Sequence, residues 1–197
     1  MKNSKFLVFS KLAMMLLILG SYSCTNGGLI NTKGIAEDKN ADRMSTREDK
    51  KNAQFLVNAA EISRNEIRYG QMGKDKGSQT HIKVLGTMVK SDHEILLAEV
   101  TSLAKVKNVA LPTAQTVRGV RTYERLNQVM GIDFGKEYSK VLIAEHREAI
   151  KIFEETSQKS EDADVRSWAS NSLPMLRAHL KQSLECEQEC LKLLSDK

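Results

Sequence analysis

The sequence predicts an all-α protein built as one bundle of long helices. Of its 197 residues, only 2 are Pro and 5% are aromatic. This composition is poorly suited to a β-sandwich or barrel, whose many turns need Gly and Pro. Charged residues make up 28% of the chain, and apolar residues recur at helical spacing in four long stretches. A chain of this length fits one domain with a tail.

Four amphipathic helices are expected in order along the chain. The first begins at Asn52, and its apolar pattern fades at Gly70 and Gly73. The second covers residues 78–107 and is followed by Leu111-Pro112, which stops helical structure. The third and fourth cover residues 133–159 and 162–194. A short helical turn at residues 123–129 interrupts the connection between the second and third helices.

The lengths of the connections predict how these helices are arranged. The first and third links are short, so each joins two antiparallel neighbours into a hairpin. The middle link is long enough to travel the length of the bundle. Two hairpins joined by one long crossover define a ferritin-like up-down four-helix bundle, which we place at residues 52–195.

The first 23 residues are typical of an export signal. Lys2, Lys5 and Lys11 form a positive start, and residues 12–19 are an unbroken apolar run. That run is shorter than the roughly 18 residues that cross a bilayer, so a permanent transmembrane helix is not expected. The three lysines also account for much of the formal charge of +5. We see no basic stripe interleaved with aromatics, so nucleic acid is not an expected partner.

Cys24 follows directly, and the stretch from Ser21 to Cys24 resembles a bacterial lipoprotein signal in which the Cys is acylated. The third residue before Cys24 is Ser21, where Leu is usual, and ordinary cleavage beside an incidental Cys is the alternative. Acylation would anchor the chain stably in a membrane. No Asp follows Cys24, so we expect an outer-membrane lipoprotein that faces the periplasm. Residues 24–51 are polar and are expected to form a flexible, disordered tether.

Three of the four histidines fall near the midpoints of predicted helices. His93, His146 and His179 lie near the centres of the second, third and fourth helices. Midpoints of antiparallel helices lie at one level, so these side chains should share a layer. His81 lies near a helix start and is expected on the surface.

Helical geometry, at about 100° per residue, indicates which polar residues point inward. The predicted inward set is Glu66, His93 and Glu145, flanked by Asp92, His146 and His179. Carboxylate and imidazole ligands together suit zinc, iron or manganese. The alternative is a hydrogen-bonded ladder in which histidines donate to Glu66 and Glu145 and fix the helix register. The sequence leaves both interpretations open.

Known catalytic motifs are incomplete. A di-iron oxidase site needs Glu-x-x-His on two helices, and here Lys90 and Leu176 stand three residues before His93 and His179. Hydrolase and nucleotide-binding motifs are also missing, so no catalytic residue is assigned.

Two further cysteines, Cys186 and Cys190, lie four residues apart near the end of the last helix. This spacing places them on one face. In an oxidising periplasm they could form a disulfide, within or between chains, or stay reduced.

Several segments together resemble an exported bacterial family with a ferritin-like domain of unknown function (domain of unknown function 4142), whose members are often labelled outer-membrane proteins. The resemblance covers roughly residues 54–184 and is carried by Gln54–Glu66, Lys90–His93, Leu111-Pro112, Gly131–Tyr138, Ala144–His146 and Leu173–Leu180. The family usually has Asp-His in both central helices, whereas this chain has Asp92-His93 and Glu145-His146. The resemblance implies a ferritin-like fold and export, and no established activity.

Two functions follow from these observations. The first is a non-enzymatic, lipid-anchored envelope protein that binds an envelope protein partner or has a structural role, for instance under stress. The second is a metal-binding ferritin-like protein that uses the Glu and His residues in the middle of the bundle.

Overall fold

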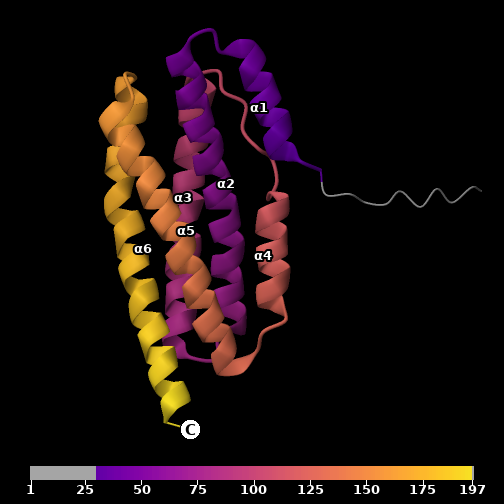
Figure 1. Ribbon diagram of the computed structural model, residues 1–197, viewed down its shortest axis with the longest axis vertical. Helices are drawn as coiled ribbons and strands as arrows, with labels where there is room; N and C mark the ends of the chain where they lie inside the picture. Colours follow the sequence, from indigo (N-terminus) through magenta and orange to yellow (C-terminus); the bar gives the residue numbers. More distant parts are fainter. Residues whose placement is uncertain (1–29, 197) are drawn as a thin grey trace, which may run out of the picture.

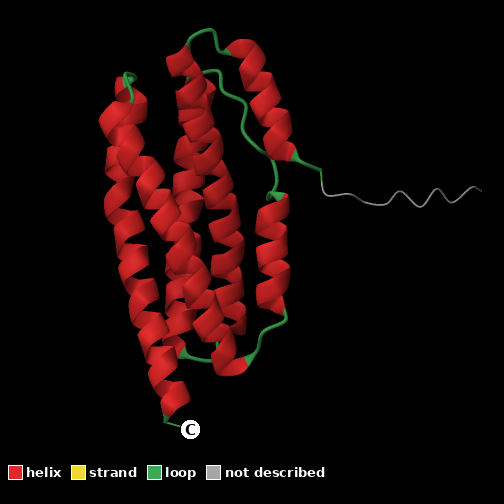
Figure 2. Cartoon of the chain, in the orientation of Figure 1, coloured by secondary structure: helices red, strands yellow, loops and turns green. Residues whose placement is uncertain are grey.

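Figure 1 shows the computed structural model, which describes residues 30–196 as six helices with antiparallel packing. The all-α prediction is confirmed, and all segments between the helices are loops and turns (Figure 2). The helices are α1 (Thr32–Arg43), α2 (Arg47–Lys76), α3 (Thr80–Val106), α4 (Val117–Asn127), α5 (Gly131–Lys159) and α6 (Ala163–Ser195).

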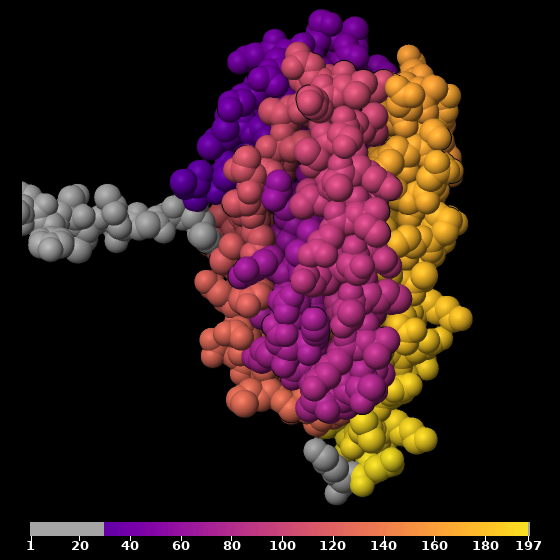
Figure 3. Space-filling model, turned by 180° about the vertical axis from the view of Figure 1, so that it is seen from behind, coloured from indigo at the N-terminus to yellow at the C-terminus, as the bar shows by residue number. Residues whose placement is uncertain are grey.

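The four long helices form two hairpins that pack against each other. Residues 77–79 join α2 to α3, and residues 160–162 join α5 to α6. The two hairpins meet through contacts of α3 with α6 and of α2 with α5. A long crossover from α3 to α5 contains α4, which packs outside α2 and α5. Seen from behind, α3 covers the middle of one face and α6 forms its edge (Figure 3).

Helix α1 corrects the predicted extent of the tether. Residues 32–43 form α1 and residues 47–51 form the start of α2, so this part of the predicted tether is helical. The Asn40 side chain accepts from the Ala110 amide at 2.7 Å and donates to its carbonyl at 2.9 Å, which ties α1 to the crossover. Thr46 and Asp49 form a capping box that starts α2 ahead of the expected Asn52. Cys24 and the export signal lie outside the described residues.

The sequence predicts that the first long helix ends near Gly70 and Gly73, but α2 continues through both to Lys76. A Cβ added to Gly70 would lie 2.6 Å from the Lys90 amide nitrogen, and one added to Gly86 would lie 2.5 Å from the Lys74 amide nitrogen. Gly70 of α2 and Gly86 of α3 therefore let the two helices approach backbone to backbone. Gly70 and Gly73 lie at sites of close packing and do not end the helix.

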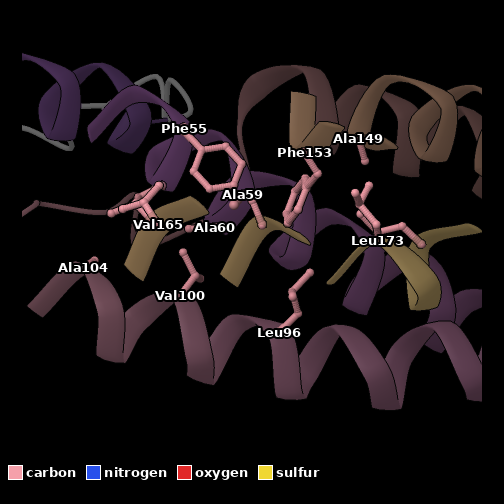
Figure 4. Close-up of a cluster of buried hydrophobic side chains, with 13 residues drawn as sticks. Phe55, Ala59, Ala60, Leu96, Val100, Ala104, Ala149, Phe153, Val165 and Leu173 are labelled. Carbon is pink, nitrogen blue, oxygen red and sulfur yellow. The ribbon is translucent and has the colours of Figure 1, made fainter. Parts of the chain in front are cut away.

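The apolar interior divides into two clusters along the helices. Figure 4 shows the first, in which Phe55 of α2 meets Phe153 of α5 edge to face at 5.0 Å, above Leu96 and Val100 of α3. The second cluster lies toward the α2–α3 turn and consists mainly of Tyr69, Met72, Ile82, Leu85, Val89, Leu126, Phe134, Tyr138, Leu142, Cys186 and Cys190. A set of buried polar residues, belonging to neither cluster, comes from the same helices.

Candidate metal centre in the middle of the helices

Each of the four long helices contributes one buried ionisable side chain to the middle of the protein. Their exposed fractions are 1% for Glu66 of α2, 0% for His93 of α3, 1% for His146 of α5 and 0% for His179 of α6. We call the three histidines the histidine layer. Their ring centroids lie 5.1 to 5.6 Å apart. The prediction that helix midpoints would bring them together is confirmed.

The three imidazoles can present nitrogen atoms to one point. One ring nitrogen from each lies within 4.8 Å of those from the others. Imidazole nitrogens are common ligands of zinc, copper, iron and nickel ions. The layer therefore has the donor set and spacing of a three-histidine metal site.

The hydrogen-bond partners outside the layer fix the tautomers of two histidines. His146 Nδ1 lies 2.9 Å from the Leu142 carbonyl oxygen, and His179 Nε2 lies 2.9 Å from Asp92 Oδ2. A carbonyl and a carboxylate only accept hydrogen bonds, so both of these nitrogens carry hydrogen. The remaining nitrogens, His146 Nε2 and His179 Nδ1, then face each other with lone pairs at 3.1 Å.

The Leu142 carbonyl, His146, His179 and Asp92 form a row of hydrogen-bonding groups. This row is short of one proton when both imidazole rings are neutral. It contains three close contacts between Leu142, His146, His179 and Asp92, while two neutral imidazoles supply only two hydrogens. The central contact needs either a third proton or another cation. Two imidazole nitrogens on one tetrahedral zinc ion lie about 3.4 Å apart, since Zn–N bonds are about 2.0–2.1 Å. The observed 3.1 Å is close to that separation.

Burial makes a proton a poor occupant of the central contact. It lowers the pKa of His146 to about 3, with a further contribution from His179. It also lowers the pKa of His179, although Asp92 opposes this change. The pKa of His93 is lowered well below its usual value by burial and by the two neighbouring imidazoles. The rings therefore stay neutral near pH 7 and keep their lone pairs available for a metal.

Two buried groups beside the row have no hydrogen-bond partner. Both ring nitrogens of His93 and both carboxylate oxygens of Glu66 are unpaired. Glu66 Oε1 lies 3.9 Å from His146 Nδ1, and the pKa of Glu66 is raised well above its usual value by burial and by the charge of Glu145. Unsatisfied buried polar groups are costly. A cation in the layer would bind His93 and offset the charge of Glu66.

Glu145 does not join the layer, contrary to the prediction. Its carboxylate lies 2.6 Å from Arg118 Nη2 of α4, and Glu148 lies 3.2 Å from the same nitrogen. The ion pair turns Glu145 away from the interior and brings the neighbouring His146 to the centre instead of the edge. The predicted ladder is also wrong in detail, because neither Glu66 nor Glu145 accepts a hydrogen bond from a histidine.

Asp92 links the buried layer to the surface. Its side chain is 37% exposed while it bonds to the fully buried His179. It also lines a surface pocket of about 200 Å³ together with Leu96, Asn171 and Met175. The sequence indicated Asp92 as a flanking residue, but its place as the outer partner of a histidine needed the structure. The Leu142 carbonyl was not predicted, since an ordinary Leu four residues before His146 gives no signal.

The remaining histidine, His81, and the two cysteines meet near the C-terminal end of α6. His81 was predicted on the surface, but its side chain is only 19% exposed because it packs against α6. Its Nε2 lies 3.4 Å from Cys190 Sγ. Cys186 and Cys190 are free, buried thiols in this structure, which corresponds to the reduced state among the alternatives that the sequence left open.

Together these features define a class of protein, an all-α domain of antiparallel helices with a buried histidine layer. Within residues 30–196, no helix combines the length and apolar character needed to cross a membrane. The chain belongs to the family described as domain of unknown function DUF4142, whose model matches residues 37–185. No curated protein and no solved structure matches the chain.

Proposed function

We propose that this protein binds one transition-metal ion in the histidine layer, with zinc as the first candidate and iron or manganese as alternatives. The observation that carries the proposal is the missing proton between His146 Nε2 and His179 Nδ1, 3.1 Å apart. His93 supplies the third nitrogen. Glu66, whose Oε1 lies 3.9 Å from His146 Nδ1, balances the positive charge of the ion. Three imidazoles favour zinc or iron over manganese, which prefers oxygen ligands.

The outer contacts support a metal role. A metal-bound histidine usually donates its other nitrogen's hydrogen to a carboxylate or carbonyl, which orients the ring. Asp92 holds His179 in this way, and the Leu142 carbonyl holds His146. The surface pockets that Asp92 and Glu145 line include none of the three histidines of the layer. We therefore favour holding or sensing a metal over turnover of an organic substrate.

We further propose that the helices form a ferritin-like four-helix bundle and that the protein acts in the cell envelope. Two antiparallel hairpins joined by a long crossover support the first statement. The charged start, apolar run and Cys24 support export and a lipid anchor in the outer membrane. Metabolic labelling with a radioactive fatty acid tests the anchor, with Cys24→Ser as the control that should lose the label.

The metal content of the purified protein tests the main proposal. The full chain is prepared with Cys24, Cys186 and Cys190 replaced by Ser, so that thiols cannot contribute, and is purified without chelator or affinity metal. We expect it to hold close to one equivalent of zinc by elemental analysis. His93→Gln and His146→Gln should lose the metal, and Ser91→Gln, on the exposed side of α3, should keep it. Circular dichroism checks that each variant remains helical.

A second readout follows from the first. Zinc at a hundredfold excess over its Kd should stabilise the protein by about 2.7 kcal/mol in chemical denaturation. His93→Gln should abolish this gain. A parent protein that binds no zinc, iron or manganese even after loading would overturn the proposal, as would full metal binding in both histidine variants. The function would then be sought in the binding of an envelope protein partner.

A further inference from the structure

The C-terminal part of α6 carries a second cluster of side chains whose types can ligate metals, separate from the histidine layer. It consists of His81 in the first turn of α3 and of Cys186, Glu189 and Cys190 on α6, and we call it the thiol cluster. Cys186 Sγ lies 3.6 Å from the His81 carbonyl oxygen, and Cys190 Sγ lies 3.4 Å from His81 Nε2. Both thiols therefore contact the same residue.

Glu189 fixes which nitrogen of His81 faces the sulfur. Its Oε2 lies 2.8 Å from His81 Nδ1. A carboxylate accepts, so Nδ1 carries the hydrogen and Nε2 presents a lone pair to Cys190. This carboxylate–histidine arrangement is the one that orients imidazole ligands on metal ions. The thiol of Cys190 donates its hydrogen to Nε2 in the absence of metal.

The distances fit a metal that replaces the thiol hydrogen. A sulfur and a nitrogen bound to one tetrahedral zinc ion lie about 3.5 Å apart, from Zn–S of about 2.3 Å and Zn–N of about 2.0–2.1 Å. Cys190 Sγ and His81 Nε2 are 3.4 Å apart. Cys186 lies one helical turn away on the same face of α6, and its thiol would have to leave the His81 carbonyl oxygen, 3.6 Å away, to join the same ion.

An unpaired acceptor beside the cluster is a further sign of a missing cation. The Oε1 atom of Gln79 is buried and has no hydrogen-bond partner. It lines the same face of Gly135 as Cys190, because a Cβ added to Gly135 would be 2.9 Å from both Gln79 Oε1 and Cys190 Sγ. Nitrogen, sulfur and oxygen acceptors thus gather at one end of the helices.

We propose that His81, Cys186 and Cys190 form a second metal site, which takes a thiophilic ion of the Zn²⁺ or Cu⁺ class. Thiolate and imidazole ligands together select such ions. Binding breaks the S–H bonds and forms metal–sulfur bonds, and the two protons leave to solvent. Both thiols lie beyond residue 185, where the family match ends. The site is therefore a property of this chain that the family assignment does not cover, and it does not depend on the histidine layer.

Cobalt distinguishes the two sites, because Co²⁺ replaces Zn²⁺ and only thiolate ligands give an intense near-ultraviolet sulfur-to-cobalt charge-transfer band. The test uses the full chain with Cys24→Ser, reduced and free of metal. We expect Co²⁺ to produce this band in the parent. Cys190→Ser should lose it and Cys186→Ser should weaken it, while His179→Gln, in the histidine layer, should leave it intact.

His81→Gln provides a second test at the rim of the cluster, where a substitution is less disruptive to folding than one at a buried thiol. Loss of the imidazole nitrogen should shift or weaken the cobalt band while the protein stays helical. The proposal is overturned if the parent shows no band, if the band survives in Cys190→Ser, or if His81→Gln leaves it unchanged. None of these results bears on zinc in the histidine layer, which is tested in the chain without cysteines.

Discussion

The histidine layer and the thiol cluster both hold an imidazole by a carboxylate on its outer nitrogen. Asp92 binds His179 at 2.9 Å, and Glu189 binds His81 at 2.8 Å. The two clusters differ in whether a neighbouring group can donate a hydrogen to the inner nitrogen of that imidazole. The inner nitrogen of His81 faces a thiol that can donate, whereas the inner nitrogen of His179 faces another lone pair. The central contact of the layer therefore needs a third proton or another cation, while the thiol cluster can satisfy the His81 nitrogen with its own hydrogen.

The two clusters also differ in their access to water. His179 is fully buried, while His81 is 19% exposed and Glu189 is 60% exposed. A buried site without a cation carries a large cost, because its polar groups cannot turn to solvent. We infer that metal binding matters more for the stability of the histidine layer than for that of the thiol cluster. The predictions below test this difference.

The largest expected effect comes from replacing the carboxylate that holds a histidine by an amide. Asp92→Asn should weaken zinc binding in the histidine layer by about 10–100-fold, since the amide holds the His179 tautomer less firmly. Glu189→Gln, the matching change in the thiol cluster, should leave this affinity unchanged. Competition with a chromophoric chelator measures both values in the cysteine-free chain. Equal loss in the two variants would show that the effect is not local to the layer.

The second effect is a pH dependence of stability in the metal-free protein. The pKa of His146 is about 3 in the folded protein and near its ordinary value of 6.5 after unfolding. Between these values the unfolded chain binds the additional proton, so stability is complete above about pH 6.5 and falls as the pH drops toward 3. His93 and His179 act in the same direction. Glu66, whose pKa is raised, acts in the opposite direction.

Each buried histidine contributes at most about 1.4 kcal/mol per pH unit in this window. His93→Gln should therefore flatten the fall in the free energy of unfolding between pH 6.5 and 5 by up to about that slope. Urea denaturation at several pH values measures it, with Ser91→Gln as the control on the same helix. An unchanged slope in His93→Gln would mean that His93 takes up its proton in the folded state.

The four long helices and the histidine layer could be predicted because they depend on local spacing. Apolar residues at helical intervals mark each helix, and helix midpoints set the level of His93, His146 and His179. Helix α1 was missed because its polar sequence looks like a tether. It is held in place by the bonds of Asn40 to Ala110, which lies 70 residues away.

The parts of the sites that were missed depend on helix rotation and on distant contacts. Glu145 and His146 are neighbours about 100° apart on one helix, so a modest rotation decides which of them faces inward. The decisive partner is Arg118 on α4, a helix that the sequence predicted only in part. The contact between His81 and Cys190 joins residues 109 positions apart. No local pattern could have brought these two residues together.

The smallest expected effect separates the two carboxylates that the sequence placed in one site. Glu145 pairs with Arg118, whose side chain is 56% exposed, whereas both oxygens of Glu66 are buried and unpaired. The Glu145 side chain itself is 14% exposed, so Glu145→Gln removes a half-buried ion pair and should lower the free energy of unfolding by about 1 kcal/mol. It should leave zinc affinity unchanged, while Glu66→Gln should weaken it. If Glu145→Gln instead released zinc, α5 would have to rotate Glu145 inward in the metal-bound protein, and the outer ion pair would be a feature of the metal-free state alone.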